Sequence, residues 1–253
     1  MEPACRPGTA AAAAVVIGIA VVLALRGVGR TPAPVEAAEP GAPLLGRRLR
    51  VWYRGLLAPL EELLLGWRVH PDALTGAQLG ASVLAGAAFW RGWIFLAGWL
   101  TILAGTLDVL DGGVARRGGL AGPRGALIDS LVDRCAEFAT FVGLGAFFHA
   151  SWVLAAVAVA AFGSFMVSYT RARAEGLGLT IERGSAQRPE RYVVLGLGAA
   201  LSGIVGHLGC AFLGYQSHAV LAAAVVLLAA LSTWTALQRA RHAGARLARR
   251  TAA

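Results

Sequence analysis

Four aspartates lie close together in a stretch of sequence that is otherwise apolar enough for a membrane interior. Asp108 and Asp111 are three residues apart, and Asp129 and Asp133 are four residues apart. In a helix, each of these spacings places the two carboxylates on one face. A charged group at bilayer depth costs roughly 2.5–3.5 kcal/mol on insertion scales, so four unpaired aspartates would be strongly unfavourable. Clustered carboxylates are ligands that suit Mg²⁺, Mn²⁺ or Ca²⁺, and the segment therefore predicts a site for divalent metal ions.

The residues between these aspartates are suited to binding phosphate groups beside the metals. Gly112 removes a side chain next to the carboxylates, Ala115 keeps the same face shallow, and Arg116 can donate a forked pair of hydrogen bonds. Gly125 allows close helix packing or contact with a flat ring. We expect two helix ends to meet through a Gly-rich loop over residues 112–125. Four carboxylates suffice to hold two divalent ions around a diphosphate.

The overall composition indicates an integral membrane protein. Of the 253 residues, 57% are hydrophobic and 15% are charged, whereas soluble domains have about 25% charged residues. The net charge is +9, and all 23 basic residues are arginines. The arginines gather at the ends of apolar runs, so we interpret these arginine-rich segments as cytoplasmic loops that contact anionic headgroups. We therefore expect no nucleic-acid partner.

The apolar runs predict an all-α fold, a polytopic membrane bundle of six core transmembrane helices. An amphipathic helix over residues 47–69 is expected to lie at the membrane interface before them. Residues 10–25 predict an additional N-terminal transmembrane segment, and residues 31–43 read as a linker. The six predicted core spans are residues 74–89, 94–110, 126–148, 152–169, 192–208 and 219–237.

The arginine distribution predicts the orientation of these spans. Arginine-rich segments follow every second span, and the connections between them are poor in charge. Basic loops remain in the cytoplasm, so both ends of the six-span bundle are expected there. We therefore predict a multi-pass protein of the cell membrane with its active site facing the cytoplasm. The basic segments are residues 47–68, 116–124, 171–191 and 239–250.

The order D-x2-D-G-x2-A-R-x8-G-x3-D-x3-D, from Asp108 to Asp133, resembles the signature of the CDP-alcohol phosphotransferase family at all eight defined positions. The six core spans and the interfacial helix are also similar to the fold of that family. The resemblance covers residues 47–241, which are expected to form the catalytic domain. Residues 1–46 remain as an anchor segment and linker, and residues 242–253 as a basic C-terminal tail.

The resemblance implies an activity and assigns roles to individual residues. The reaction would move a phosphatidyl group from CDP-diacylglycerol to an alcohol, with release of CMP, in phospholipid biosynthesis. Asp133 would be the general base that deprotonates the acceptor hydroxyl, and a homodimer is implied. Two Mg²⁺ or Mn²⁺ ions would be held by Asp108, Asp111, Asp129 and Asp133. The implied pocket for the CDP-linked donor consists of Asp108, Asp111, Gly112, Ala115, Arg116 and Gly125.

Two further elements bear on the alcohol acceptor. SYTRARAE at residues 168–175 and RPER at residues 188–191 resemble the phosphatidylinositol-phosphate synthase branch, which typically has SYxKARAE and ERPER. The resemblance implies a basic pocket for a phosphorylated acceptor, inositol phosphate in that branch, and maps it onto Arg171, Arg191 and Arg239. Arg171 stands where the branch usually has lysine.

Two alternatives remain open at the level of the sequence. Phosphatidylglycerophosphate synthase or another phospholipid synthase of the same family would share the aspartates and differ in the acceptor. A divalent-metal transporter would also contain membrane aspartates, but it needs them throughout the depth of the bundle. A separate motif, Pro71-x2-Leu74-Thr75, we interpret as a helix start with Asp72 or Thr75 near the N-cap.

Overall fold

The computed structural model describes residues 46–180, 188–213 and 218–251, which form seven helices and contain no strand. The all-α fold class is thereby confirmed. Residues 10–25 and 31–43, predicted as an anchor and a linker, lie outside the described residues. The helices are α2 (Gly46–Gly66), α3 (Pro71–Trp90), α4 (Ile94–Arg117), α5 (Pro123–Phe147), α6 (Val153–Glu175), α7 (Arg188–Leu213) and α8 (Ala219–Thr251).

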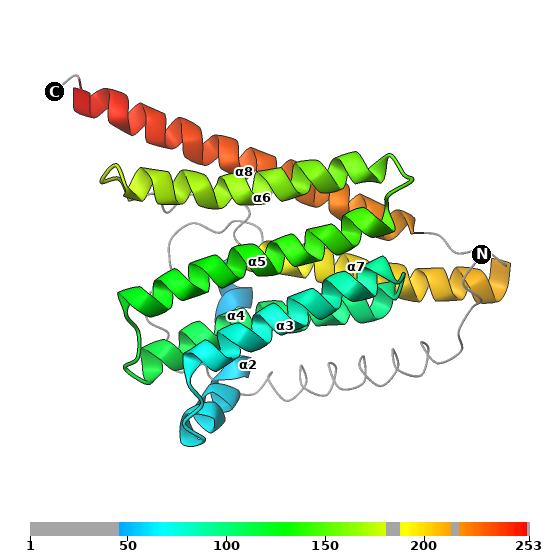
Figure 1. Ribbon diagram of the computed structural model, residues 1–253, viewed down its shortest axis with the longest axis horizontal. Helices are drawn as coiled ribbons and strands as arrows, with labels where there is room; N and C mark the ends of the chain where they lie inside the picture. The colour runs from blue at the N-terminus through cyan, green and yellow to red at the C-terminus, as the bar shows by residue number, and fades with distance from the viewer. Residues whose placement is uncertain (1–45, 181–187, 214–217, 252–253) are drawn as a thin grey trace.

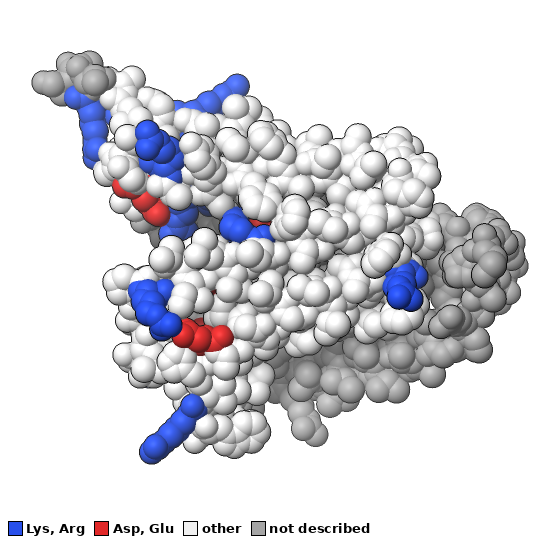
Figure 2. Space-filling model, in the orientation of Figure 1, with Lys and Arg blue, Asp and Glu red and all other residues white. Residues whose placement is uncertain are grey.

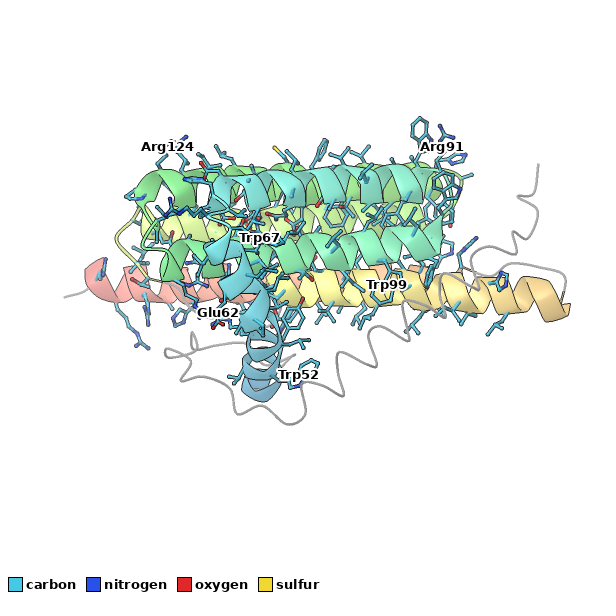
Figure 3. The ribbon with its side chains drawn as sticks, turned by 90° about the horizontal axis from the view of Figure 1, so that it is seen from below. Trp52, Glu62, Trp67, Arg91, Trp99 and Arg124 are labelled. Atoms are coloured by element: carbon cyan, nitrogen blue, oxygen red, sulfur yellow. The ribbon has the colours of Figure 1, made fainter. Side chains whose placement is uncertain are left out.

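Helices α3 to α8 run side by side, and helix α2 crosses them near one end (Figures 1 and 3). Helix α3 packs against α4 and α5, while α4 continues the packing to α7 and α7 to α8. Helix α6 lies along α8. Helix α2 contacts α4, close to the segment that carries Asp108 and Asp111.

Five of these helices, α3, α4, α6, α7 and α8, are long and apolar enough to cross a membrane. Helix α5 has a comparable length of 25 residues but carries a high density of charge. Its charged positions in the apolar part are Asp129, Asp133, Arg134 and Glu137. The count of six core spans therefore stays a prediction, and it depends on α5, which contributes two of the four aspartates.

The described surface is apolar along the bundle and charged toward one end. Leu84, Leu103, Leu131 and Phe162 are among the large apolar side chains exposed on four different helices, as expected for contact with lipid. On the face drawn in Figure 2, charged side chains gather mostly toward one end. Figure 3 places Arg124 at that end of the bundle, and Arg91 at the opposite one.

Helix α4 extends further than its apolar run, which corrects the expected Gly-rich loop over residues 112–125. The helix continues to Arg117, and the connection to α5 comprises only residues 118–122. Two features explain the extension: arginines in the last turn interact favourably with the helix dipole, and neighbouring side chains fill the space beside the glycines. Gly112 and Arg116 are consequently helical residues.

Helices α7 and α8 also extend beyond the apolar runs that predicted them. Helix α7 begins at Arg188, before the apolar run, with Pro189 in its first turn, where proline is well tolerated. Helix α8 continues to Thr251, so residues 242–251 belong to this helix. There, Ala243 and Leu247 pack against the end of α6 and the residues after it. Helix ends of this kind consist of polar residues, so the extent of an apolar run does not predict them.

Helices α3 and α5 pack backbone against backbone through two glycines. A Cβ at Gly86 would lie 2.3 Å from the carbonyl oxygen of Ala139, and a Cβ at Gly143 would lie 2.0 Å from the carbonyl oxygen of Gly86. No side chain larger than hydrogen fits at either position. Small residues permit such close contacts between helices in membranes. This contact sets the distance between α3 and α5, and hence between the polar residues that face each other further along.

Candidate active site

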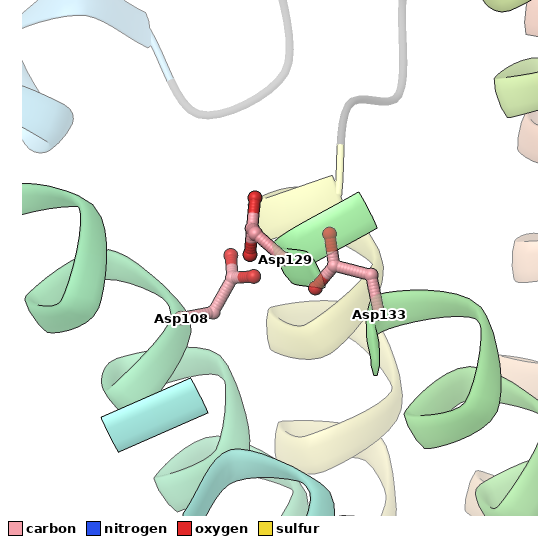
Figure 4. A group of neighbouring side chains, drawn as sticks. All are labelled: Asp108, Asp129 and Asp133. Carbon is pink, nitrogen blue, oxygen red and sulfur yellow. The ribbon is translucent and has the colours of Figure 1, made fainter. Parts of the chain in front are cut away.

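Three of the four predicted aspartates form one cluster between α4 and α5. Asp108 comes from α4, whereas Asp129 and Asp133 come from successive turns of α5 (Figure 4). One carboxylate oxygen from each residue lies within 4.8 Å of the others. Asp133 is buried, and the other two are half-buried. On α5 the spacing therefore does place both carboxylates on one face, and tertiary packing brings this face together with Asp108 of α4.

The fourth aspartate, Asp111, is not a member of this group. Its Oδ2 accepts a hydrogen bond of 2.8 Å from the Thr75 hydroxyl on α3, and the side chain is buried. Thr75 also donates to the carbonyl oxygen of Pro71. The N-cap of α3 is His70, whose Nδ1 accepts from the Asp72 amide, so Thr75 faces the candidate site instead of the helix end.

Gln78 of α3 links the cluster across three helices. Its amide nitrogen Nε2 lies 2.8 Å from Asp133 Oδ1, 3.2 Å from Asp108 Oδ1 and 3.4 Å from the Tyr192 hydroxyl. Gln78 is completely buried. Sequence reasoning missed this residue, although a glutamine within an apolar span is itself a signal of an internal polar contact.

Arg188 supplies positive charge to the cluster from the first turn of α7. Its Nη1 lies 3.3 Å from Asp108 Oδ1 and also pairs with Asp133 Oδ2. The charge among the aspartates is thereby partly compensated, as the cost of burying carboxylates requires. Sequence reasoning placed Arg188 in a basic segment and in the RPER element, but assigned it no role at the aspartates.

The predicted donor residues lie along α4 and at the start of α5. Arg116 is exposed, and its guanidinium folds over Gly112: a Cβ at Gly112 would be 3.1 Å from Arg116 Nη1. Ala115 is half-buried on the same helix. Among the described residues, none lies within 4 Å of the position of a Cβ at Gly125, so this glycine packs against no described helix and leaves space in front of the first turn of α5.

Helix α2 is fastened to the α4 segment that carries the signature. The Tyr53 hydroxyl hydrogen-bonds to Thr106 Oγ1 at 2.7 Å, and burial raises the pKa of Tyr53. Arg117 pairs with Glu61 and Glu62, both at 3.0 Å. A Cβ at Gly113 would lie 2.3 Å from Glu61 Oε1, so this glycine admits the Glu61 carboxylate. Gly112 of the signature and its neighbour Gly113 thus each accommodate a side chain, Gly112 that of Arg116 from the same helix and Gly113 that of Glu61 from α2.

The three arginines predicted to bind the acceptor have different environments. Arg191 is buried and pairs with Glu137 of α5 at 2.8 Å, while its Nε and Nη1 are buried without a hydrogen-bond partner among the described residues. Arg239 is buried and donates to the carbonyl oxygen of Val167 at 2.8 Å. Arg171 is 56% exposed and pairs with Glu175 one turn later.

A small cavity with a mostly apolar lining lies beside the Arg191–Glu137 pair. Its volume is about 20 Å³, which is about the space that one water molecule needs. It is lined by residues of α4, α5, α7 and α8, among them Thr101, Glu137, Thr140, Arg191 and Tyr192. The unpaired guanidinium nitrogens of Arg191 therefore lie next to space that a polar group can enter.

The ligand atoms of the cluster fit a hard divalent cation. All three side chains offer carboxylate oxygen, with no imidazole or thiolate among them, and Mg²⁺ and Mn²⁺ prefer such ligands. Within the part of the chain that the structure describes, this is the one group of three or more acidic, histidine or cysteine residues with such spacing.

The geometry agrees with comparisons with known proteins. Residues 68–235 match the family model described as CDP-alcohol phosphatidyltransferase. A phosphatidylinositol phosphate synthase of Cutibacterium acnes is 32% identical over 161 residues, which cover 61% of this chain and 77% of the relative.

Two crystal structures of phosphatidylinositol phosphate synthase from Mycobacterium tuberculosis are also similar, each at 29% identity over 73% of this chain. One is in complex with manganese and citrate, with a TM-score of 0.62 and 87% of that chain covered. The other has CDP-diacylglycerol bound, with a TM-score of 0.60 and 92% covered. The family model spans well over half of the chain and includes the complete aspartate signature. This protein belongs to the CDP-alcohol phosphatidyltransferase family and is an enzyme of that type.

Proposed function

We propose that this enzyme transfers a phosphatidyl group from CDP-diacylglycerol to a phosphorylated alcohol, inositol phosphate first among the candidates, with release of CMP. The observation that carries the proposal is the convergence of Asp108, Asp129 and Asp133 near two arginines of α7, the half-buried Arg188 and the buried Arg191. Carboxylates that hold metal ions, next to cationic side chains, provide what a reaction between two phosphate-bearing substrates needs.

Asp108, Asp129 and Asp133 are the proposed ligands of Mg²⁺ or Mn²⁺, and Asp111, one turn along α4 from Asp108, is the proposed fourth carboxylate for a pair of ions. When bound, such ions stabilise negative charge on the transferring and leaving phosphates. The manganese complex of the Mycobacterium tuberculosis enzyme supports this assignment. Thr75 and Gln78 hold the side chains of Asp111 and Asp133 through hydrogen bonds, so the carboxylates have defined orientations before any substrate arrives.

Asp133 is the proposed general base for the acceptor hydroxyl. It is the most buried aspartate of the cluster, and the Gln78 amide holds its Oδ1. Its Oδ2 pairs with Arg188, which has a flexible side chain and lies on α7, the helix that also carries Arg191. A proton acceptor must lie within hydrogen-bonding reach of the hydroxyl, and this position borders both the metal ligands and the α7 arginines.

The donor pocket is proposed at the end of α4 and the start of α5. The surface there is shallow because its residues have small side chains or none, namely Gly112, Ala115 and Gly125. The Arg116 guanidinium is exposed and can pair with a diphosphate. CDP-diacylglycerol bound to the Mycobacterium tuberculosis enzyme supports this substrate. The open space in front of Gly125 fits the alternative in which this glycine makes room for a flat ring.

Arg171, Arg191 and Arg239 are the proposed contacts of the acceptor phosphate. Two nitrogens of Arg191 are buried without a hydrogen-bond partner in the part of the chain that the structure describes, and such groups favour a charged ligand. The similarity to phosphatidylinositol phosphate synthases supports inositol phosphate. Glycerol 3-phosphate is the alternative, since it offers the same phosphate on a smaller alcohol.

The proposed location is the cell membrane, with the site facing the cytoplasm and the protein acting as a homodimer among membrane lipids. Arginines toward the site end of the bundle support the orientation, because basic residues remain on the cytoplasmic side. A cytoplasmic site would face the compartment in which soluble phosphorylated alcohols are available.

The test is CMP release from CDP-diacylglycerol by the purified protein in lipid nanodiscs with Mg²⁺. Inositol 1-phosphate, glycerol 3-phosphate, free inositol and serine are offered as acceptors in parallel, and the lipid products are identified by mass spectrometry. We expect inositol 1-phosphate to give the highest kcat/KM and free inositol to be a poor substrate. Preference for free inositol or serine would contradict a phosphorylated acceptor, and preference for glycerol 3-phosphate would select the alternative.

A further inference from the structure

Arg188 lies outside the eight signature positions, yet its guanidinium reaches two of the signature carboxylates. Its Nη1 contacts both Asp108 and Asp133, and the side chain is only 16% exposed. Its Nε is buried and has no hydrogen-bond partner among the described residues. One nitrogen, Nη1, therefore makes both contacts with the aspartates, while Nε makes no hydrogen bond to a described residue.

The Arg188 guanidinium and a metal ion would compete for the same carboxylate oxygens. The ligand oxygens of Asp108, Asp129 and Asp133 lie within 4.8 Å of one another, so the space between them is small. A divalent ion held there would meet the positive guanidinium at very short range, where two like charges repel strongly. Either cation can neutralise the carboxylates, but both cannot occupy the same gap.

We propose that Arg188 is a built-in counter-cation that pairs with Asp108 and Asp133 before metal binding, is displaced by the metal, and then offers its guanidinium to the donor phosphates. This inference rests on the proposed function, because it takes the aspartates to be the metal ligands. It makes Arg188 a residue that couples metal occupancy to phosphate binding.

The local structure allows this exchange without movement of the helix. Arg188 is the first residue of α7, and Pro189 fixes the backbone of the first turn. The long arginine side chain can rotate while the backbone stays in place. A guanidinium is also well matched to phosphate, since its planar fork donates two hydrogen bonds to neighbouring oxygens.

The first test measures Mn²⁺ binding by electron paramagnetic resonance in the absence of any substrate. Arg188→Gln removes the competing charge, and we expect it to bind Mn²⁺ roughly tenfold more tightly or better, the usual worth of a charge-assisted contact. Arg188→Lys keeps a charge and should stay closer to the wild type. The control is Arg117→Gln, whose arginine pairs with Glu61 and Glu62, and its Mn²⁺ affinity should be unchanged.

The outcomes separate this inference from the proposed function. Wild-type protein that binds Mn²⁺, together with an Arg188→Gln variant of equal or weaker affinity, would overturn the exchange and leave the metal site intact. Wild-type protein that binds no Mn²⁺ would overturn the metal assignment itself, and the exchange with it. A thermal melt of each variant confirms that the comparison is made on folded protein.

The second test follows the side chain directly. Phenylglyoxal modifies accessible arginines, and peptide mapping by mass spectrometry reports the rate at each position. We expect Arg188 of the wild type to be modified slowly without metal and faster once Mn²⁺ is added, while Arg117 reacts at the same rate in both conditions. An Arg188 rate that does not rise with Mn²⁺ would contradict displacement.

Discussion

At the residue scale, Asp133 is the aspartate whose two carboxylate oxygens are each held by a different neighbouring helix. Gln78 of α3 donates to one of its oxygens, and Arg188 of α7 pairs with the other. Because Gln78 holds Oδ1, the carboxylate keeps its orientation even when Arg188 leaves Oδ2, and reorganisation is one of the main costs that an active site avoids.

Replacing Asp133 by asparagine should remove most of the turnover. The amide keeps the size of the side chain but cannot take the proton of the acceptor, and loss of a general base typically reduces the rate by about 10²–10⁴-fold. CDP-diacylglycerol binding, measured by equilibrium dialysis, should be weakened much less than kcat. Asp72→Asn is the matched control, since Asp72 lies in the first turn of α3, outside the aspartate cluster, with its carboxylate 3.5 Å from Arg124. Near-normal turnover of Asp133→Asn would place the base elsewhere.

Substitution of Arg191 should distinguish binding of the acceptor from binding of the donor. Arg191→Ala should raise the KM for the phosphorylated acceptor about tenfold or more and the KM for CDP-diacylglycerol much less, because one charge-assisted contact is lost on the acceptor side. Steady-state kinetics with each substrate varied in turn measures both values. Arg171→Lys should be milder because it keeps the charge, and Arg173→Ala, on the exposed side of α6, is the control. Unchanged acceptor kinetics in Arg191→Ala would favour an uncharged alcohol.

At the element scale, the α3–α5 contact decides whether residues of the two helices meet. Gln78 and Thr75 lie on α3, whereas Asp129 and Asp133 lie on α5, and the close approach of Gly86 and Gly143 occurs further along the same pair. A change that separates these helices should therefore affect the site without touching any polar residue.

Gly143→Ala tests this coupling. The added methyl group would overlap the backbone of α3, and such overpacking typically costs about 1–3 kcal/mol. We expect a lower melting temperature in nanodiscs together with weaker Mn²⁺ binding. Gly76→Ala on α3 is the matched control: its Cβ meets nothing within 4 Å, and alanine is the better helix former, so stability should be unchanged or slightly higher. Equal melting temperatures for the two variants would show that the contact can relax at no cost.

At the scale of the whole molecule, the site lies toward the end of the bundle that carries most of the charged side chains, and α2 covers its α4 side. This arrangement keeps the carboxylates within reach of water-soluble ligands while the apolar surface along the helices faces lipid. The far half of the bundle is a continuous apolar core, which includes Phe89, Leu144, Leu221 and Leu228.

Removal of divalent metal should abolish activity of the entire protein. Treatment with EDTA is expected to stop CMP release, and added Mg²⁺ or Mn²⁺ should restore it, because the ligand set consists of carboxylate oxygens. EDTA added as its magnesium complex controls for effects of the chelator itself. Full turnover after removal of metal would refute a metal-dependent mechanism.

The membrane orientation can be tested with two matched cysteine variants in a background without native cysteines. Ala121 lies in the α4–α5 connection, and Ala150 lies in the α5–α6 connection at the other end of the bundle; both are exposed. In inverted membrane vesicles, an impermeant maleimide should label Ala121→Cys, and in intact cells it should label Ala150→Cys, as the arginine distribution predicts. Labelling of both variants from the same side would contradict the topology.

The sequence by itself determined the fold class, the family and the aspartate segment. Periodicity within one helix decides which residues share a face, so Asp129 could be paired with Asp133 from spacing alone. Family membership is likewise a property of one continuous stretch of chain. The apolar runs also located the helices, although they ended α4 and α8 too early because polar helix ends leave no apolar signal.

Only the tertiary structure decided which side chains meet across helices. It grouped Asp108 with the two α5 aspartates, turned Asp111 toward Thr75, and brought in Gln78 and Arg188, which are 30 and 80 residues away from Asp108 along the chain. No local pattern encodes these contacts, because they depend on how closely α3, α4, α5 and α7 approach one another. That approach is set by glycine contacts and packed side chains between helices that are distant in the sequence.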